Sequence, residues 1–259
     1  MQNGREAIIE YFNRVAPEYG VKHGADMPGG QYSFGQLYRR ILSPYFKPGM
    51  EVLELGCGNG ASTEMLASYG VKLVATDICE KMLKVAAARG IANTTFRCLD
   101  IMEIAGAQDL GGFDVIVSFN AFSYLPDKAR VLHDLSRLLR PQGRLIILDM
   151  NALSPVYWFC VLMGRNEMRQ WWGAIKEMTP GNLRFLFQRC GYAVELIRTL
   201  NFVPHATQGR VFRALRAMNP LLNATPLIRK LAMRVLVVAT RSEAHNGSKQ
   251  GKVDEGMAR

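Results

Sequence analysis

Between residues 50 and 151 the apolar positions alternate between two spacings. Short, nearly continuous apolar runs that are typical of buried strands occur at 51–56, 71–77, 94–100, 113–120 and 144–151. Between them lie segments with the three-to-four-residue apolar spacing of amphipathic helices, at 62–70, 79–90 and 127–143. This alternation predicts a parallel sheet that is covered by helices on both faces.

The segments on either side of this region have other patterns. Residues 1–47 predict a helical cap with many aromatic positions, and 179–191 predicts a helix with Thr179 as N-cap and Pro180 in its first turn. Two further strands are expected at 192–198 and 233–241. We therefore predict one domain over 1–241, with lid-like insertions at 151–180 and 199–231, and a disordered tail at 242–259.

The length and composition allow one large α/β domain with additions, or two small domains, in a reducing compartment. The chain has 259 residues and is 49% apolar, which is enough for one large α/β core. Its five cysteines and four histidines are scattered, without CxxC or HExxH, which predicts free buried thiols and no metal site. No apolar run is long enough to span a membrane, and no secretory signal is recognisable, so a cytoplasmic location is expected.

The net charge of +10 is concentrated in one part of the chain. No acidic residue lies between Glu195 and Glu243. That span contains eight basic residues, namely Arg198, Arg210, Arg213, Arg216, Arg229, Lys230, Arg234 and Arg241. A local basic surface is predicted, which could contact an anionic membrane through 198–234, contact RNA phosphates, or be merely solvated.

A glycine-rich turn follows the first predicted strand, in the string "VLELGCGNGAS" at 52–62. Glycines at alternate positions (Gly56, Gly58 and Gly60) allow the backbone to pass close under a ligand, because a Cβ would occupy that space. The spacing also fits the fingerprint of dinucleotide-binding folds. Glu54, however, stands two residues before the first glycine, and an acid there suits a cationic ligand better than a pyrophosphate.

Acidic and amide side chains stand at the ends of the next strands. Asp77 ends "VATD", Asp100 ends "CLD", and Asn120 ends "FDVIVSFN". Because neighbouring parallel strands end at the same edge of a sheet, these residues could share one ligand. Asp77 is placed to accept hydrogen bonds from ribose hydroxyls, and Asp100 to receive an adenine amino group.

The motifs "VLELGCGNG", "ATD", "CLD", "FDVIVSFNAFSYLPD" and "LLRPQGRLIILD" resemble those of the class I S-adenosylmethionine-dependent methyltransferases. The branch resembled contains small-molecule methyltransferases and the ubiquinone/menaquinone C-methyltransferases, and the match covers about residues 10–150. The resemblance implies a Rossmann-like, doubly wound sheet of seven strands. It is mostly parallel, and the late strand "MRVLVVAT" is antiparallel.

The resemblance also implies roles for particular residues around S-adenosylmethionine. The turn of Gly56, Cys57, Gly58 and Gly60 would lie under the methionyl part, with Cys57 contributing only its backbone. Glu54 and the Asn120 carbonyl would meet the ammonium group, and Tyr19 would act as a lid. Around the nucleoside, Asp77 would bind the ribose, Ile78 and the Ile101 N–H would contact the adenine ring, and Asp100 would bind its amine.

The reaction implied is an in-line methyl transfer that needs positioning more than a general base. No catalytic residue is singled out, although His205, beside Pro204, is a candidate to face the acceptor. The "NAFSY" segment lacks the Pro-Pro-aromatic signature of amino-methylating nucleic-acid enzymes, and Asn120 stands where divalent-metal enzymes of this fold have an acid.

The acceptor is therefore expected to be a small-molecule or lipid-linked intermediate. The basic helices, the apolar "PVYWFCVLMG" and the Trp171–Trp172 pair suggest an apolar lid over a lipophilic acceptor. An RNA methyltransferase is the main alternative. A dinucleotide-dependent oxidoreductase and a non-catalytic cofactor-binding protein are less favoured, and the oligomeric state is left open.

Overall fold

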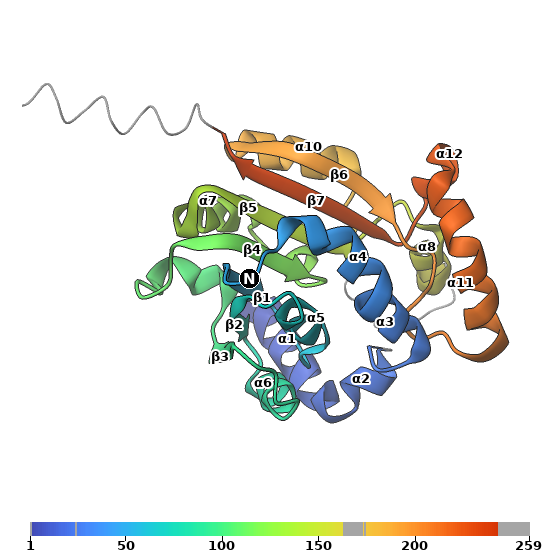
Figure 1. Ribbon diagram of the computed structural model, residues 1–259, viewed down its shortest axis with the longest axis horizontal. Coiled ribbons are helices and arrows are strands. Elements are labelled where there is room, and N and C mark those ends of the chain that lie inside the picture. Colours follow the sequence, from blue (N-terminus) through green and yellow to red (C-terminus); the bar gives the residue numbers. More distant parts are fainter. Residues whose placement is uncertain (1, 24, 163–172, 174, 243–259) are drawn as a thin grey trace, which may run out of the picture.

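A computed structural model of the chain describes residues 2–23, 25–162, 173 and 175–242 (Figure 1). Seven strands form one sheet in the order β3-β2-β1-β4-β5-β7-β6. Their bounds are β1 (Glu51–Leu55), β2 (Lys72–Asp77), β3 (Thr94–Cys98), β4 (Phe113–Phe119), β5 (Leu139–Met150), β6 (Tyr192–Leu200) and β7 (Arg234–Arg241). β1 to β5 are paired in parallel, and β7 runs antiparallel to both β5 and β6. The predicted fold class is confirmed.

Helices cover both faces of the sheet. After the strands of the parallel half come α5 (Ala61–Ala67), α6 (Glu80–Ala87), the 3-10 turns η4 (Ile101–Gly106) and η5 (Phe122–Tyr124), and α7 (Lys128–Leu138). Later in the chain come α8 (Pro155–Leu162), α10 (Pro180–Arg189), α11 (Gly209–Ala224) and α12 (Pro226–Arg229). One core joins the sheet to α7 and α10, and a second joins its other face to α5 and the N-terminal helices.

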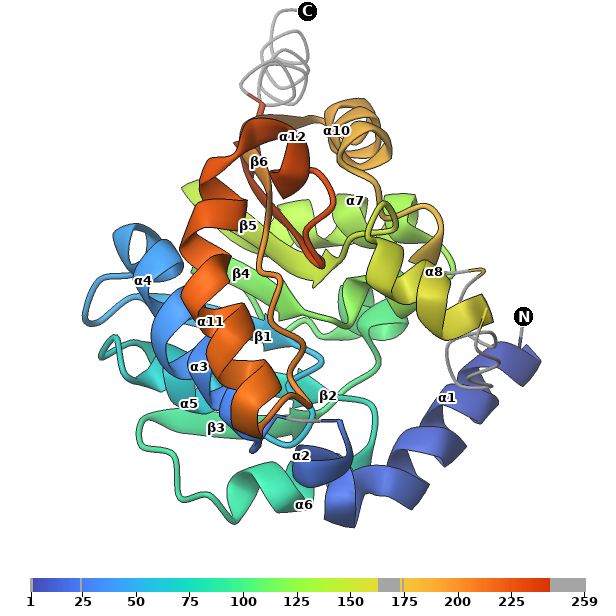
Figure 2. The same cartoon turned by 90° about the vertical axis from the view of Figure 1, so that its right-hand side faces the viewer.

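The N-terminal segment predicted to be helical at 1–47 is mostly helical among its described residues. It comprises α1 (Gln2–Val15), η1 (Ala16–Glu18), α2 (Tyr19–Lys22), α3 (Pro28–Tyr32), the π-helical turn η2 (Ser33–Tyr38), α4 (Arg39–Leu42) and η3 (Ser43–Tyr45). Tyr11 and Val15 of α1 pack on Met82 of α6, while Phe34 and Tyr38 of η2 enter the core beneath the sheet. Figure 2 shows α1 and α2 lying beside α6.

The basic C-terminal segment forms a long helix against the N-terminal one. α11 runs beside α3 in both views (Figures 1 and 2). Asn219 Nδ2 donates to the Tyr32 hydroxyl at 2.9 Å, and the Arg216 guanidinium lies 5.5 Å from the Tyr32 ring centroid. Arg216 therefore packs on Tyr32, although it belongs to the same three-residue spacing as Arg210 and Arg213.

Several expectations need correction. The predicted helix 127–143 ends at Leu138, and β5 starts at Leu139 instead of 144. At the start of β5, Leu139 pairs with Phe113 of β4, and the register then shifts. Gln142 lies in this irregular part with φ +65°, and regular pairing resumes at Arg144.

The prediction of buried thiols is also wrong in one case, because Cys98 is exposed while Cys57 and Cys79 are buried. β3 is an edge strand with little cover. Trp171, Trp172 and the tail 243–259 lie outside the described residues. Among those described, no helix is long and apolar enough to cross a membrane.

The turn after β1 needs glycine for reasons of backbone geometry. Gly56, Gly58 and Gly60 have φ values of +70°, +54° and +83°, in the left-handed region that favours glycine. A Cβ on Gly56 would lie 2.4 Å from the Ala121 Cβ, and one on Gly60 would lie 3.0 Å from the Ala86 Cβ. Of these three glycines, Gly58 alone has nothing within 4 Å of its would-be Cβ. Ligand space is therefore a reason for glycine at Gly58 only.

Gly56→Ala is expected to destabilise the protein more than Gly49→Ala, its matched control. Gly49 has φ +83° but open space around its would-be Cβ, so its variant measures backbone strain alone. Gly56→Ala adds a clash with Ala121, which should cost about 1–3 kcal/mol more. Urea unfolding of both variants measures the difference, and equal losses of unfolding free energy would contradict the packing argument.

Candidate functional site

A cavity of about 630 Å³ lies at the edge of the sheet where the parallel strands end. Its volume is in the range usual for small-molecule sites. Of the predicted site residues, those that line it are Tyr19, Gly56, Cys57, Gly58, Asp77, Ile78, Asp100, Ile101 and Asn120. Glu54 and Gly60 are not among the lining residues. The sequence motifs therefore come together at one place, as strand order β2-β1-β4 requires.

Glu54 lies beneath the glycine turn with its carboxyl group fully buried. Ser62 Oγ and Thr63 Oγ1 donate to its two oxygens at 2.5 and 2.6 Å. Burial raises the pKa of Glu54 to about 7, the two hydroxyl groups oppose this, and the charge of Asp77 adds to it. Ser62, which does line the cavity, stands between Glu54 and the ligand space.

Asp77 ties the glycine turn to the end of β2. Its Oδ2 accepts from the Gly58 N–H at 2.8 Å and its Oδ1 accepts from the Cys79 N–H at 2.9 Å. Burial raises the pKa of Asp77, and the backbone donors partly counter that rise. The carboxylate is thus fixed in orientation at the cavity wall before any ligand binds.

Asp100 caps η4 and meets the N-terminal helix. Its Oδ1 accepts from the Met102 N–H at 2.9 Å, while its Oδ2 lies 2.6 Å from Arg5 Nε of α1. Arg5 also lines the cavity, so α1 closes over this end of it. Sequence reasoning missed Arg5, because a lone basic residue in a surface helix carries no signal of its own.

Asn120 sits in a strained conformation at the point where the chain leaves β4. It has φ +54°, and its N–H donates to the Leu148 carbonyl at 3.0 Å. Among the described residues, its buried Oδ1 has no hydrogen-bond partner. Buried polar atoms normally have partners, so this oxygen is available to a ligand donor.

Tyr19 lies over the cavity from α2. Its ring stacks on His23 with a centroid separation of 4.5 Å. Burial and the charge of Asp77 raise the pKa of Tyr19 to about 12, so its hydroxyl is neutral at physiological pH. The arrangement is compatible with the predicted lid role, which stays a prediction.

The rest of the lining contains several aromatic rings, most of which the sequence reasoning missed. Phe12, Phe34, Phe119 and Tyr124 line the cavity, together with His205. The Phe34 ring lies 5.2 Å from the His205 ring and 6.1 Å from that of Phe119. The aromatic density of 1–47 was the available signal for the first two. His205, which the sequence made a candidate, is in the cavity wall.

No group of three or more His, Cys, Asp or Glu side chains in the described ranges is arranged to hold a metal ion. The Cys57 N–H donates to the Thr76 carbonyl at 2.8 Å, and burial raises the pKa of its thiol. This cysteine lies among acids and is not activated as a nucleophile.

Glu54→Gln is expected to remove a pH dependence of stability. The folded-state pKa of Glu54, about 7, exceeds the value of about 4.3 for a free glutamate, so the folded state keeps a proton that the unfolded state releases. The resulting stabilisation is complete below about pH 4 and is lost as the pH rises through 7. Relative to the variant, the wild type should lose up to about 3 kcal/mol of unfolding free energy between pH 4.5 and 8.

Urea unfolding at several pH values checks this. Glu51→Gln is the matched control, because Glu51 lies on the same strand and pairs with Lys72 at the surface, 3.0 Å away. A constant difference between wild type and Glu54→Gln over the whole range would show that Glu54 is ionised in the folded state.

Comparison with known proteins agrees with this geometry. Residues 53–147 match the family model described as a methyltransferase domain. A ubiquinone biosynthesis O-methyltransferase of Xanthomonas oryzae pv. oryzae is 27% identical over 117 residues, which are 44% of this chain and 48% of that protein. The chain thus matches about half the length of this relative.

Solved structures show the same fold. Magnesium protoporphyrin IX methyltransferase from Synechocystis PCC 6803, with bound S-adenosylmethionine, has a TM-score of 0.59 and 17% identity, covering 92% of this chain and 97% of that one. An S-adenosylmethionine-dependent methyltransferase from Mesorhizobium loti has a TM-score of 0.54 and 20% identity, covering 80% and 98%. The family model thus identifies a methyltransferase domain at residues 53–147, and the solved structures share the fold of the chain.

Proposed function

We propose that the protein transfers a methyl group from S-adenosylmethionine to a small-molecule or lipid-linked acceptor. The observation that carries this proposal is the mixed lining of the cavity. It combines the glycine turn and the acids Asp77 and Asp100 with several aromatic rings and His205. The polar groups suit a nucleoside, and the rings suit an apolar or planar acceptor.

The residues present fit the cofactor. Asp77 would bind the ribose hydroxyls, Asp100 and the Ile101 N–H would bind the adenine, and Ile78 would pack on its ring. The unpartnered Asn120 Oδ1 and the adjacent main-chain carbonyl offer acceptors for an ammonium group. When bound, S-adenosylmethionine supplies a methyl group on a positively charged sulfur.

The protein's own contribution is positioning and exclusion of water. Gly58 leaves open space at the cavity floor, and Glu54 holds the start of α5 through Ser62 and Thr63. α1 and α2 cover the opening with Arg5, Phe12 and Tyr19. Holding two reactants in line can lower a barrier by up to about 7–11 kcal/mol, so a dedicated base is not required.

Replacement of Asp77 tests the cofactor site. In Asp77→Asn the charged acceptor for the ribose is lost, so affinity for S-adenosylhomocysteine should fall about 10- to 100-fold. Isothermal titration calorimetry measures this on samples whose folding is checked by circular dichroism. Asp109→Asn is the control, because Asp109 is exposed, pairs with Arg97 and lies outside the cavity. Unchanged affinity in folded Asp77→Asn would refute the assignment.

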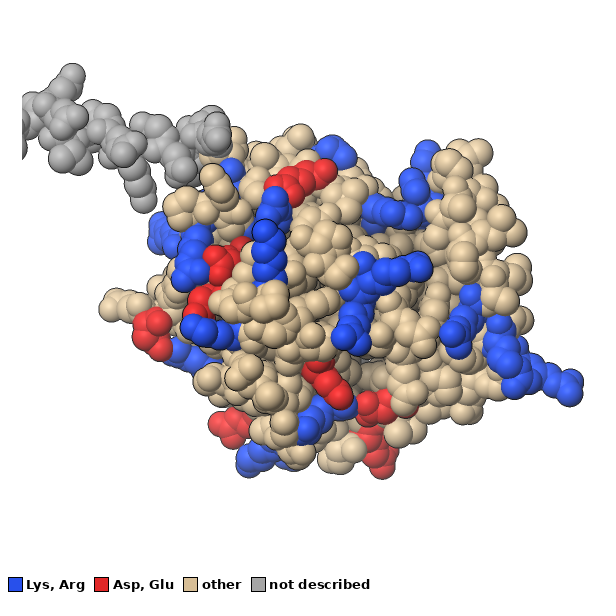
Figure 3. All heavy atoms as spheres, in the orientation of Figure 1, with Lys and Arg blue, Asp and Glu red and all other residues tan. Residues whose placement is uncertain are grey.

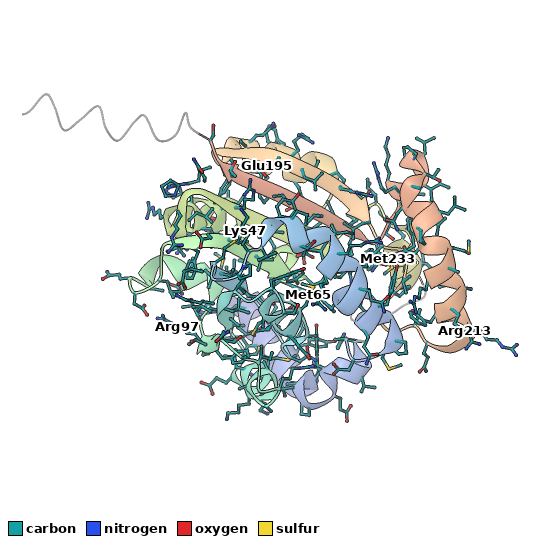
Figure 4. All side chains as sticks on the ribbon, in the orientation of Figure 1. Lys47, Met65, Arg97, Glu195, Arg213 and Met233 are labelled. Carbon is teal, nitrogen blue, oxygen red and sulfur yellow. The ribbon has the colours of Figure 1, made fainter. Side chains whose placement is uncertain are left out.

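One surface of the protein, which includes α8, α11 and α12, supports the narrower proposal of a lipid-linked acceptor. On α11 and α12 the side chains of Leu221 and Leu227 are 70% and 75% exposed, and Phe159 of α8 is 61% exposed. Arginine and lysine gather over the same edge, where the chain has no acidic residue (Figure 3). Arg213 extends away from the body of the protein at the end of α11 (Figure 4).

We propose that this surface, formed by α8, α11 and α12, contacts an anionic membrane. Exposed apolar side chains flanked by arginines are the features of interfacial helices. Arg234, counted in the basic span of the sequence, does not belong to this surface, because it is only 8% exposed. An RNA phosphate contact would use the basic residues but would leave the exposed leucines without a role.

Vesicle sedimentation tests the membrane contact. The protein should bind phosphatidylcholine vesicles that contain phosphatidylglycerol, and not phosphatidylcholine alone. Arg210→Ala with Arg213→Ala should weaken binding by about 2 kcal/mol, roughly 30-fold. Leu221→Asp with Leu227→Asp should abolish it. Phe185→Asp, on α10 and 66% exposed in the wild type, should have no effect. Equal binding to both vesicle types would refute the proposal.

The domain organisation is proposed in the same way. Residues 1–241 would form one methyltransferase domain, with 1–47 as a cap and 199–231 as a lid next to the acceptor.

Incubation of cell extract with methyl-tritiated cofactor, followed by separation of lipid, RNA, protein and soluble fractions, identifies the acceptor class. Label that appears in RNA alone would favour the alternative function, an RNA methyltransferase.

A further inference from the structure

A buried polar cluster lies behind the acceptor wall. It consists of His205, Tyr38, Asn201 and Arg234, which we call the His205 cluster. Its members come from η2, from the segment after β6 and from the start of β7. His205 alone among them lines the cavity. The cluster therefore connects the protein interior to the acceptor side through one imidazole.

The orientation of the Asn201 amide is fixed by the backbone. Its Oδ1 accepts from the Val203 N–H at 2.9 Å, so the other end of the amide is the nitrogen. That Nδ2 donates to Ser33 Oγ at 3.1 Å and to the Tyr38 hydroxyl at 2.9 Å. Ser33 gives its own proton to the Gly29 carbonyl at 2.8 Å, which is consistent with its accepting from Asn201.

The Tyr38 hydroxyl has one proton and three polar neighbours. Asn201 Nδ2 can only donate to it, and the Arg234 guanidinium, whose pKa the Tyr38 hydroxyl helps to raise, has no acceptor atom. The third neighbour is His205 Nε2, at 3.5 Å. The Tyr38 proton therefore points to His205, and Nε2 accepts it.

This assignment fixes the tautomer of His205. A neutral imidazole that accepts at Nε2 carries its proton on Nδ1. Burial and the positive charge of Arg234 lower the pKa of His205 to about 3, so the ring is neutral at physiological pH. Among the described residues, Nδ1 of His205 has no hydrogen-bond partner.

The backbone holds His205 in place without a ligand. The Gly30 N–H donates to the His205 carbonyl at 3.0 Å, and the Gly29 N–H donates to the Thr207 carbonyl at 3.1 Å. A Cβ on Gly29 would lie 2.3 Å from the Pro204 carbonyl oxygen, so glycine permits this close approach. The imidazole is thus anchored to α3 on one side and to Tyr38 on the other.

Arg234 gives this end of the cavity a positive potential. Its guanidinium donates to the Tyr157 hydroxyl. Burial opposes the charged form of Arg234, but Tyr157, Tyr38 and, to a smaller extent, Asp149 raise its pKa. No carboxylate oxygen of the described residues lies within 4 Å of this guanidinium, so it has no direct ion pair. A buried cation without a close counter-ion favours an anion nearby.

We propose that His205 is a hydrogen-bond donor, through Nδ1–H, to an anionic oxygen of a planar acceptor, and that Tyr38, Asn201 and Arg234 position it. The proposal rests on the proposed function, because it concerns the acceptor of the same cavity. His205 takes no proton in this role. The Phe34 ring beside it, and Phe119 next to Phe34, supply apolar walls for a planar group. A phenolate and a carboxylate both provide the required oxygen.

Nuclear magnetic resonance of ¹⁵N-histidine-labelled protein tests the tautomer. His205 should be neutral with its proton on Nδ1 from pH 8 down to pH 5. Tyr38→Phe removes the donor to Nε2, so that preference should be lost. Protonation of His205 in this range, or a proton on Nε2 in the wild type, would overturn the proposal.

Ligand binding tests the anion. With S-adenosylhomocysteine at saturation and pH 8, affinities are measured for 4-nitrophenolate against 4-nitroanisole and for 4-nitrobenzoate against 4-nitrobenzamide. At least one anion should bind tenfold or more tightly than its neutral match, and the preferred pair distinguishes phenolate from carboxylate. His205→Ala should remove that preference, because a hydrogen bond to a charged group contributes about tenfold or more.

The matched variant is His205→Asn, whose side-chain amide N–H occupies the place of Nδ1–H and should restore most of the preference. Absence of anion preference in the wild type, or its survival in His205→Ala, would overturn the proposal. Affinity for S-adenosylhomocysteine is measured on the same samples. If the wild type does not bind S-adenosylhomocysteine, the proposed function is contradicted. If it binds the cofactor but shows no anion preference, only the proposed role of His205 is contradicted.

Discussion

The parallel pairing of β1 with both β2 and β4 is the constraint on which the candidate site depends. β1 lies between β2 and β4, which both follow it in the chain. The helix after β1, α5, packs on one face of the sheet, whereas α7, after β4, packs on the other. The edge opens at this point, as in other doubly wound sheets. The glycine turn, Asp77 and Asn120 are neighbours there only because these strands are.

The nucleoside half of the site could be predicted from the sequence because each of its residues stands next to a strand with a clear apolar pattern. Asp77 follows three buried positions of β2, and the glycine turn follows β1 directly. Once the strands are placed, the positions of such residues follow. The reason why the turn needs glycine, however, differs from the expected one. Gly56 and Gly60 are needed for backbone geometry and packing rather than for ligand space.

The acceptor half could not be predicted in the same way. It depends on contacts between residues that are far apart along the chain, such as Tyr38 with His205 and Ser33 with Asn201. No periodicity relates η2 to the segment after β6, and the charge pattern suggested that Arg234 is on the surface. Its burial follows from the pairing of β7, which places its first residue between β5 and β6.

The position of β7 inside the sheet has a consequence for biosynthesis. β7 is the last of the seven strands to leave the ribosome, yet its neighbours β5 and β6 depend on it for pairing. Until it emerges, β5 presents a long apolar edge with unpaired backbone groups, which is a template for aggregation. The parallel strands can assemble early, whereas β6 has no partner strand until translation has passed residue 241. Chains stalled before that point are natural clients for chaperones.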